Sequence, residues 1–293
     1  MDLLQPNKAD LTAAIAQPVE GFESARYRRT LRGSPVTLQL LSLPLLLFFA
    51  LPIVAVIFQV SFTDIWSGLR EPQVLQAVGI SLKTSLISTM LTLLLGTPVA
   101  YLLGRHNFPG KRLFEALVDL PTVLPPAVAG IALLLAFGRR GLLGGTLEAL
   151  GLHLAFSQAA VVMAQLFVAS SFYVRAAMLG FASVDRELDE AAQLDGANRW
   201  QVFRMVVMPL AGQGVLSGGV MSWARALGEF GATIIFAGNM PGTTQTMPLA
   251  IYIGFEVNLA NALTLSVILI TLSFVALAVV RLIVSRHTEF VAG

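Results

Sequence analysis

Residues 35–63 read PVTLQLLSLPLLLFFALPIVAVIFQVSFT, a stretch without a single Asp, Glu, Lys or Arg. About 20 apolar residues are enough for an α-helix to cross the hydrocarbon core of a membrane. A secretory signal peptide has a shorter apolar region after a short basic leader, whereas a long polar leader precedes this stretch. It therefore predicts a retained transmembrane helix.

Five further apolar runs follow along the chain, at 84–104, 120–138, 154–174, 210–236 and 257–280. Only the run at 210–236 contains charged residues, Arg225 and Glu229. Strands of a membrane barrel would instead show segments of roughly ten residues with alternating polarity. Together the runs predict an all-α integral membrane protein with six transmembrane helices.

The composition excludes several other classes of protein. The 293 residues are 56% hydrophobic and 12% charged, and the mean hydropathy is +0.76. A soluble domain carries roughly 25% charged residues, so a soluble enzyme is excluded. Intrinsic disorder is excluded because the chain has too much apolar surface to stay solvated. The chain has no cysteine, so it forms no disulfide or thiolate site.

The distribution of Lys and Arg predicts the orientation, because basic residues are enriched in cytosolic loops. With the N-terminus inside, the outer loops hold only Arg70, Arg139 and Arg140. The cytosolic side then holds a larger basic set, Lys8, Arg26, Arg28, Arg29, Arg32, Arg105, Lys111, Arg112, Arg186, Arg199, Arg204, Arg281 and Arg286.

From these features we expect a multi-pass protein of the inner (plasma) membrane with both termini in the cytosol. The expected parts are an N-terminal tail at 1–34, a transmembrane domain at 35–287 and a C-terminal tail at 288–293. The N-terminal tail is expected to be mobile, with a helix on the membrane surface as the alternative. Membrane lipid is an expected partner and nucleic acid is not.

The longest predicted cytosolic connection, at about 183–203, has the pattern of a helix-turn-helix. Ser183 is a candidate N-cap, Gly196 can end the first helix, and Asn198 can cap a second helix that runs through Trp200 and Phe203 toward Pro209. On the first helix, four residues share one face by their spacing, and they are Leu188, Ala191, Ala192 and Asp195. Small side chains there would let another protein approach closely; a helix that only rests on the bilayer surface is the alternative.

The same connection resembles the EAA motif of ATP-binding-cassette (ABC) importer permeases. The resemblance rests on Glu190-Ala191-Ala192, Asp195-Gly196-Ala197, Phe203 and the Pro209-Leu210 step. It implies a coupling helix that contacts a cytosolic ABC ATPase subunit. The implied coupling residues are Leu188, Glu190, Ala191, Ala192, Asp195, Gly196 and Ala197.

A second stretch resembles the molybdate permeases of that family. It comprises RALGEFGAT at 225–233, FAGN at 236–239 and PGTTQTMPLAIY at 241–252. Sulfate permeases share the Gly-Glu-Phe-Gly core at 228–231, so a sulfate or tungstate importer is the alternative. The resemblance implies a type I ABC importer permease fold, molybdate import, a second permease copy in a homodimer and an extracytoplasmic molybdate-binding protein.

Two features inside the predicted spans are candidates for a translocation pathway. Arg225 and Glu229 are four residues apart, so they can pair on one helix face. The pair either fixes the fifth span against its neighbours or holds Arg225 toward a path for an oxyanion. Pro125 and Pro126 remove backbone donors and predict a kink or half-helix, which lines the pathway or serves packing alone.

Three threonines complete the candidate pathway or gate residues, namely Thr233, Thr243 and Thr244. The segment 238–256, which holds the latter two, is rich in Gly, Thr and Pro. We expect it to be a re-entrant or surface element near the outer gate, with an inert loop as the alternative.

The sequence predicts no catalytic residue and no cofactor bound by this chain. His106, His153 and His287 are far apart and have no second ligand at metal-binding spacing. No phosphate-binding glycine-rich loop is present, so ATP and Mg are expected on the partner ATPase. A membrane-embedded enzyme and a passive channel are the alternatives. The first lacks a nucleophile with a base, and the second has no use for an ATPase-docking helix.

Overall fold

The computed structural model describes residues 35–292, and side chains mainly between 36 and 284. The predicted tail at 1–34 and the side chains of Arg286 and His287 lie outside the described residues. The first compact unit ends at Ala55 and contains most of helix α3 (Pro35–Gln59), a strongly apolar helix with two prolines in its interior. The second unit begins at Val56 and contains all the elements discussed below.

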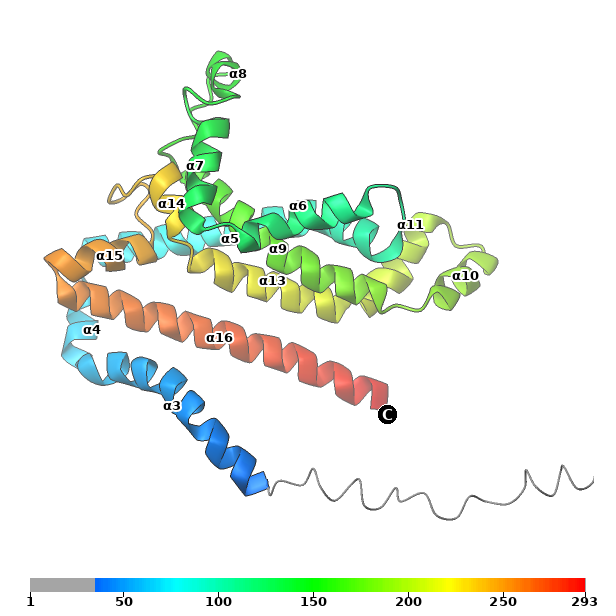
Figure 1. The fold of residues 1–293 in the computed structure, drawn as a ribbon, viewed down its shortest axis with the longest axis horizontal. Coiled ribbons are helices and arrows are strands. Elements are labelled where there is room, and N and C mark those ends of the chain that lie inside the picture. The colour runs from blue at the N-terminus through cyan, green and yellow to red at the C-terminus, as the bar shows by residue number, and fades with distance from the viewer. Residues whose placement is uncertain (1–34, 293) are drawn as a thin grey trace, which may run out of the picture. The chain divides into compact units, whose positions relative to one another are not determined.

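The described residues form helices and no strands, which confirms the predicted all-α class (Figure 1). After α3, the elements are α4 (Phe62–Gly68), α5 (Pro72–Arg105), α6 (Lys111–Val123), α7 (Pro126–Phe137), α8 (Gly144–Ala149), α9 (Gln158–Ala182), α10 (Arg186–Leu194), α11 (Arg199–Val202), the π-helical turn η1 (Phe203–Val207), α12 (Met208–Leu210), α13 (Gly212–Leu227), α14 (Gly231–Phe236), α15 (Met247–Val257) and α16 (Leu259–Ala292).

Four of the helices are long and apolar enough to cross a membrane, namely α3, α5, α9 and α16. Two bent pairs can supply the remaining spans. The axes of α6 and α7 differ by 116°, and those of the α11 to α12 segment and α13 differ by 68°. The prediction of six spans therefore agrees with the structure when each bent pair counts as one span. Helix α16 continues through the boundary that the sequence suggested at 287–288.

Helix α5 begins well before the run predicted from hydropathy. Its first turns contain Gln73, Gln76 and Lys83, which interrupt the apolar pattern. Two hydrogen bonds use polar side chains of this part of the helix. Lys83 Nζ donates to Gln158 Oε1 over 3.0 Å, and Ser81 Oγ accepts from the backbone N–H of Met247 over 2.7 Å. The early half of α5 therefore belongs to the helix although it is not uniformly apolar.

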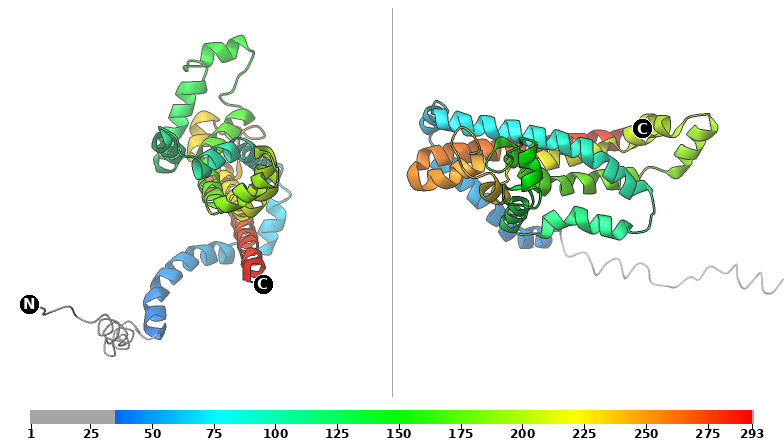
Figure 2. Two further views of the ribbon diagram at one scale, coloured as in Figure 1. Left: turned by 90° about the vertical axis from the view of Figure 1, so that its right-hand side faces the viewer. Right: turned by 90° about the horizontal axis from the view of Figure 1, so that it is seen from above.

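Helix α9 packs along both α5 and α13, and these three helices form the centre of the second unit (Figures 1 and 2). Lipid is as apolar as a hydrophobic side chain, so helices in a membrane associate through close packing and hydrogen bonds. Trp223 Nε1 of α13 donates to Ser85 Oγ of α5 over 3.1 Å. Ser222 Oγ of α13 donates to the carbonyl of Ala169 in α9 over 3.0 Å.

Glycines allow α9 and α13 to approach until their backbones touch. A Cβ atom added to Gly214 would lie 2.8 Å from the carbonyl oxygen of Ala176 and 2.8 Å from the Cα of Gly180. Both neighbours are backbone atoms, which cannot move aside without displacing a helix. The contact between α9 and α13 therefore depends on the absence of a side chain at Gly214.

We expect Gly214→Ala to lower the apparent melting temperature of the detergent-solubilised protein by several degrees. Overpacking of a close contact costs about 1–3 kcal/mol, more than the roughly 1 kcal/mol that alanine gains over glycine within a helix. The matched control is Gly212→Ala in the same helix, where an added Cβ meets nothing within 4 Å. Equal melting temperatures for the two variants would contradict this account.

Candidate coupling surface and translocation pathway

The short helix α10 follows α9 after a tight connection. Asp185 is its N-cap and accepts a hydrogen bond from the backbone N–H of Glu187 over 3.1 Å. The prediction of Ser183 as the N-cap is wrong by two residues. Ser183 instead ends α9 and donates its hydroxyl hydrogen to the carbonyl of Gly180. A serine near a helix boundary can cap either side, so composition alone does not decide between them.

The turn between α10 and α11 agrees closely with the sequence. Gly196 has a φ of +91°, a left-handed conformation that favours glycine. The N–H of Ala197 closes the turn on the carbonyl of Ala192 over 3.0 Å. Asn198 and Gln201 form a reciprocal capping box at the start of α11. The predicted helix-turn-helix is confirmed.

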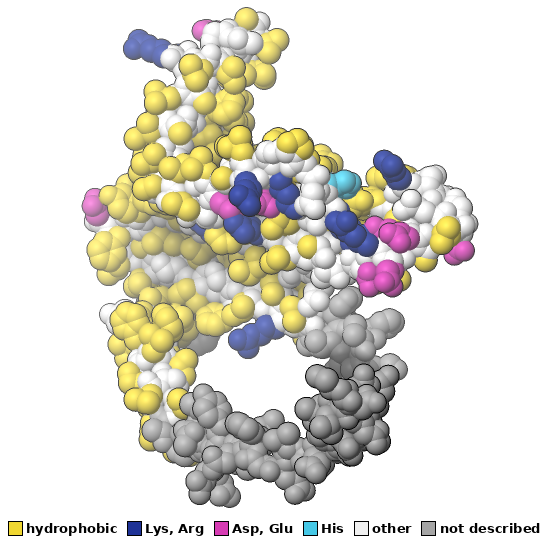
Figure 3. Space-filling model, turned by 45° about the vertical axis from the view of Figure 1, so that its right-hand side comes forward, with side chains coloured by type: hydrophobic (Ala, Val, Ile, Leu, Met, Phe, Trp, Pro, Cys, Tyr) yellow, Lys and Arg dark blue, Asp and Glu magenta, His cyan; other side chains and the backbone are white. Residues whose placement is uncertain are grey.

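The outward side of this helix-turn-helix combines apolar and acidic residues. Leu188 is 45% exposed, Leu194 is 89% exposed, and Glu190, Ala191 and Asp195 are exposed as well. Figure 3 shows that many charged side chains of that face lie toward the end of the molecule that carries α10 and α11. An exposed surface of this kind can bind another protein.

Ala192 and Ala197 lie on the inward side of the same turn. Both are half-buried and pack against the core cluster formed by α5, α9 and the segment after α11. Ala192 therefore does not share the exposed face of Leu188 and Ala191, although its spacing suggested that it would. The two inward alanines allow the turn to lie close to the helix bundle.

Aromatic rings attach the segment after the turn, α11 and η1, to the helix bundle. The ring of Phe203 lies 5.0 Å from that of Tyr101 in α5, edge to face, and 6.3 Å from that of Phe181 in α9. Trp200 stacks on Phe203 at 5.5 Å while remaining 66% exposed. Such ring pairs stabilise a contact by about 0.5–1.5 kcal/mol beyond the buried area. Phe203 thus holds this segment on both α5 and α9.

Arg225 and Glu229 form the ion pair that their spacing predicted. Arg225 Nη1 lies 2.8 Å from Glu229 Oε2, and the Glu229 side chain is only 1% exposed. Glu229 Oε1 also accepts the N–H of Ala232 in α14 over 2.9 Å. The prediction of one continuous helix over 210–236 is wrong, because α13 ends at Leu227 and α14 begins at Gly231. Glu229 lies in the break and satisfies a backbone donor at the start of α14.

The two prolines lie where the third span breaks. Helix α6 ends at Val123, and Pro126 is the first residue of α7. The predicted kink is confirmed, and its 116° angle makes the segment two helices rather than a bent one. A cavity of about 120 Å³ lies at this break, and its lining residues are Pro121, Thr122, Leu124, Pro126, Val168, Phe172 and Arg225. Pro125 is exposed beside it.

The three threonines have different surroundings. Thr233 is completely buried in α14, and its hydroxyl has no hydrogen-bond partner among the described residues. Thr243 is exposed in the turn before α15. Thr244 is buried and accepts the N–H of Met240 over 3.0 Å, which is a turn-stabilising role. Part of the segment predicted as a re-entrant or surface element is helix α15, which packs on α16 and α5.

A second arginine–carboxylate pair was not singled out from the sequence. Arg175 of α9 donates from Nε to Asp119 Oδ1 of α6 over 2.5 Å and makes a further contact from Nη2 to Oδ2. The side chain of Arg175 is 54% exposed. The amphipathic spacing of Lys111, Glu115 and Asp119 predicts a helix with one charged face just before the third span, but it does not identify Arg175 as a partner.

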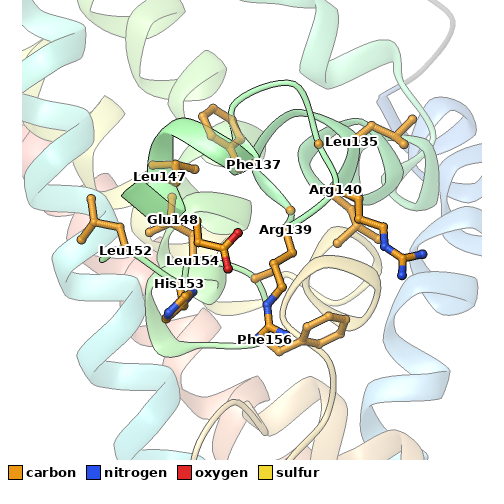
Figure 4. A pocket seen from close by; sticks show the side chains of 15 residues that line it. Leu135, Phe137, Arg139, Arg140, Leu147, Glu148, Leu152, His153, Leu154 and Phe156 are labelled. Carbon is orange, nitrogen blue, oxygen red and sulfur yellow. The ribbon is translucent and has the colours of Figure 1, made fainter. Parts of the chain in front are cut away.

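A larger cavity of about 650 Å³ lies at the turn from α7 to α8 (Figure 4). Arg139, Arg140, Glu148 and His153 supply its charged and titratable side chains among apolar ones such as Phe156. No group of three or more His, Cys, Asp or Glu side chains able to hold a metal ion occurs in the described part of the chain.

Residues 96–289 match the family described as the binding-protein-dependent transport system inner membrane component. The chain is 41% identical over 228 residues to the molybdenum transport system permease protein ModB of Mycobacterium tuberculosis, covering 78% of this chain and 86% of that protein. It is 32% identical over 251 residues to the probable sulfate transport system permease protein cysT of Chlorokybus atmophyticus, covering 84% and 88%.

The fold is also similar to that of a solved structure, a bacterial ABC transporter involved in the import of the polysaccharide alginate. The TM-score is 0.64 at 16% identity, and the match covers 86% of this chain and 95% of that chain. This likeness confirms the predicted importer permease fold. With a family match over most of its length, the chain belongs to the inner membrane components of binding-protein-dependent transport systems.

Proposed function

We propose that this protein is the permease subunit of an ABC importer that carries molybdate inward. The observation that carries the proposal is the 41% identity, over most of both chains, to a molybdenum transport permease. In the proposed assembly, two copies form a homodimer, two cytosolic ATPase subunits bind ATP and Mg, and an extracytoplasmic binding protein delivers the anion. The chain itself performs no catalysis.

The distribution of basic residues along the fold supports an orientation with both termini in the cytosol. Arg105 ends α5, Lys111 begins α6, and Arg186 and Arg199 begin α10 and α11. Arg70 lies in the connection before α5, and Arg139 and Arg140 follow α7. An excess of Lys and Arg is typical of the cytosolic side, which supports a location of α10 and α11 where an ATPase could reach them.

We assign the ATPase contact to the exposed side of α10 and its turn. Leu188, Ala191 and Leu194 would enter an apolar groove of the ATPase, with Glu190 and Asp195 at the rim. Ala192 and Ala197 would act from the inward side, and the exposed Gly196 would set the shape of the turn. ATP binding would draw two such helices together, and hydrolysis would release them.

Arg225 is the proposed attraction point for the anion. Arg225 borders the 120 Å³ cavity at the break of the third span, and one of its guanidinium nitrogens pairs with Glu229. An arginine beside an aqueous path attracts a dianion, while the carboxylate keeps the attraction moderate. A site in a pathway must bind weakly enough for the ion to leave.

Sulfate import is the second candidate function, because the chain is also similar to a probable sulfate permease at 32% identity. Molybdate and sulfate are both tetrahedral dianions. Arg225 therefore cannot distinguish between them by their charge. Selection between them would then fall to the binding protein.

ATP-driven uptake into liposomes tests the proposed cargo. The liposomes contain this chain, its ATPase and its binding protein, and labelled molybdate is offered against excess tungstate or excess sulfate. We expect uptake that depends on ATP and that tungstate, but not sulfate, suppresses. Uptake of labelled sulfate would show that sulfate, and not molybdate, is the cargo. The absence of ATP-dependent oxyanion uptake would overturn the proposed function.

Substitutions at Gly196 test whether the turn is needed for the proposed ATPase contact. We expect Gly196→Val to abolish co-purification of the ATPase, because a left-handed conformation costs a β-branched residue at least about 1–2 kcal/mol. An added Cβ meets nothing within 4 Å, so the effect comes from the backbone alone. Gly196→Asn is the control and should keep the ATPase, since asparagine tolerates this conformation. An intact complex with the valine variant would show that the turn is not needed.

Variants of the ion pair between Arg225 and Glu229 distinguish a role in the translocation pathway from a structural role. We expect Arg225→Gln to destabilise the protein by about 3–5 kcal/mol, because it leaves the Glu229 carboxylate buried and unpaired. The double variant Arg225→Gln with Glu229→Gln removes that charge and should recover the stability. If Arg225 attracts the anion, uptake stays at least tenfold lower in the double variant. Recovery of uptake together with stability would assign the pair to packing alone.

A further inference from the structure

Arg105, the last residue of α5, has a buried side chain that contacts the start of the proposed coupling helix. The side chain is 5% exposed. Its guanidinium donates to the carboxylate of Asp189 in α10 and to the carbonyl of Val184 in the connection from α9. In return, Arg186 Nη2 donates to the carbonyl of Arg105 over 3.1 Å. The two arginines therefore join α5 and α10 in both directions.

These contacts carry much of the attachment of the first half of α10. No residue of α10 is fully buried, so apolar packing contributes little there. Burying a guanidinium costs free energy unless it is paired and hydrogen-bonded. The folded chain therefore favours the arrangement in which Arg105 contacts both Asp189 and Val184. The helix dipoles add to the preference, because Arg105 lies at a helix C-terminus and Asp189 lies in the first turn of a helix.

Helix α5 connects this contact to the neighbourhood of Arg225. Its length of 34 residues corresponds to roughly 50 Å at 1.5 Å per residue. In the middle part of the helix, Ser85 accepts the hydrogen bond from Trp223, two residues before Arg225 in α13, and Ser81 accepts one from Met247. A continuous helix with fixed contacts at its end and in its middle part can pass a displacement from one contact to the other.

We propose that Arg105 and Asp189 link α10 mechanically to α5, so that movement of α10 by the ATPase is passed to the transmembrane helices through this pair. Arg105 is then a positioning residue for ATP-driven transport. The inference rests on the proposed function of α10 as the ATPase contact, and it names the helix that α10 drives.

The first test measures the link without any partner. The natural chain has no cysteine, so Asn107→Cys and Glu187→Cys can carry two spin labels on exposed sites at the end of α5 and in α10. We expect a narrow distance distribution in the otherwise native chain and a broad one in the double variant Arg105→Met with Asp189→Leu. Apolar replacement of both partners preserves burial without leaving a lone charge. An unchanged distribution would overturn the inference.

The second test measures coupling in the complete importer. For the same double variant we expect ATPase binding at the wild-type level and a fall of at least tenfold in molybdate taken up per ATP hydrolysed. Arg112→Met is the matched control, since Arg112 is an exposed arginine near the start of α6, and it should behave like the wild type.

The outcomes separate this inference from the proposed function. An unchanged uptake per ATP in the double variant, or a loss of the ATPase from the complex, would overturn the mechanical link. A wild-type complex without ATP-driven uptake would instead overturn the proposed function, while the spin-label distances would still report on the attachment of α10.

Discussion

Backbone hydrogen bonding without water is the constraint on which the rest of this fold depends. Within a hydrocarbon core, each unpaired N–H or C=O group costs several kcal/mol, so breaks in a helix must be covered by protein or face a water-filled path. The chain nevertheless breaks near Pro125, near Ala211 and at Glu229. At the last break, a buried carboxylate accepts one backbone donor and pairs with an arginine. Glu229 therefore satisfies a backbone hydrogen-bond donor at the break and is also a candidate functional residue.

The helix packing and the charge pairing follow from the same environment. Because lipid provides no hydrophobic drive for association, contacts such as Gly214 on Gly180 and Trp223 on Ser85 hold the central helices together. Such contacts are specific in position, and they hold α5, α9 and α13 against one another. Under the proposed function, close packing of this kind would help the helices to pass movement over a long distance.

Much of the fold could be predicted from the sequence, because apolar runs, the left-handed Gly196 and the Asn198 cap have strong local signals. The break at 228–230 could not, since glycine and glutamate are also found within helices and only the contact of Glu229 with α14 decides otherwise. The partners of Arg105 and Arg175 were also out of reach. They lie on other helices, and sequence spacing carries no information about which helix ends meet.

Under the proposed function, two of the arginine–carboxylate pairs, Arg225 with Glu229 and Arg175 with Asp119, would affect a transported anion. An unpaired arginine in a low-dielectric environment would hold a dianion strongly, because the Coulomb energy between charges rises as the dielectric constant falls. Pairing each arginine with a carboxylate reduces its net charge while leaving guanidinium N–H groups as donors. Arg175 is half exposed, so water weakens its field further. Neutralised arginines can attract an oxyanion and still release it, which is the balance that rapid passage demands.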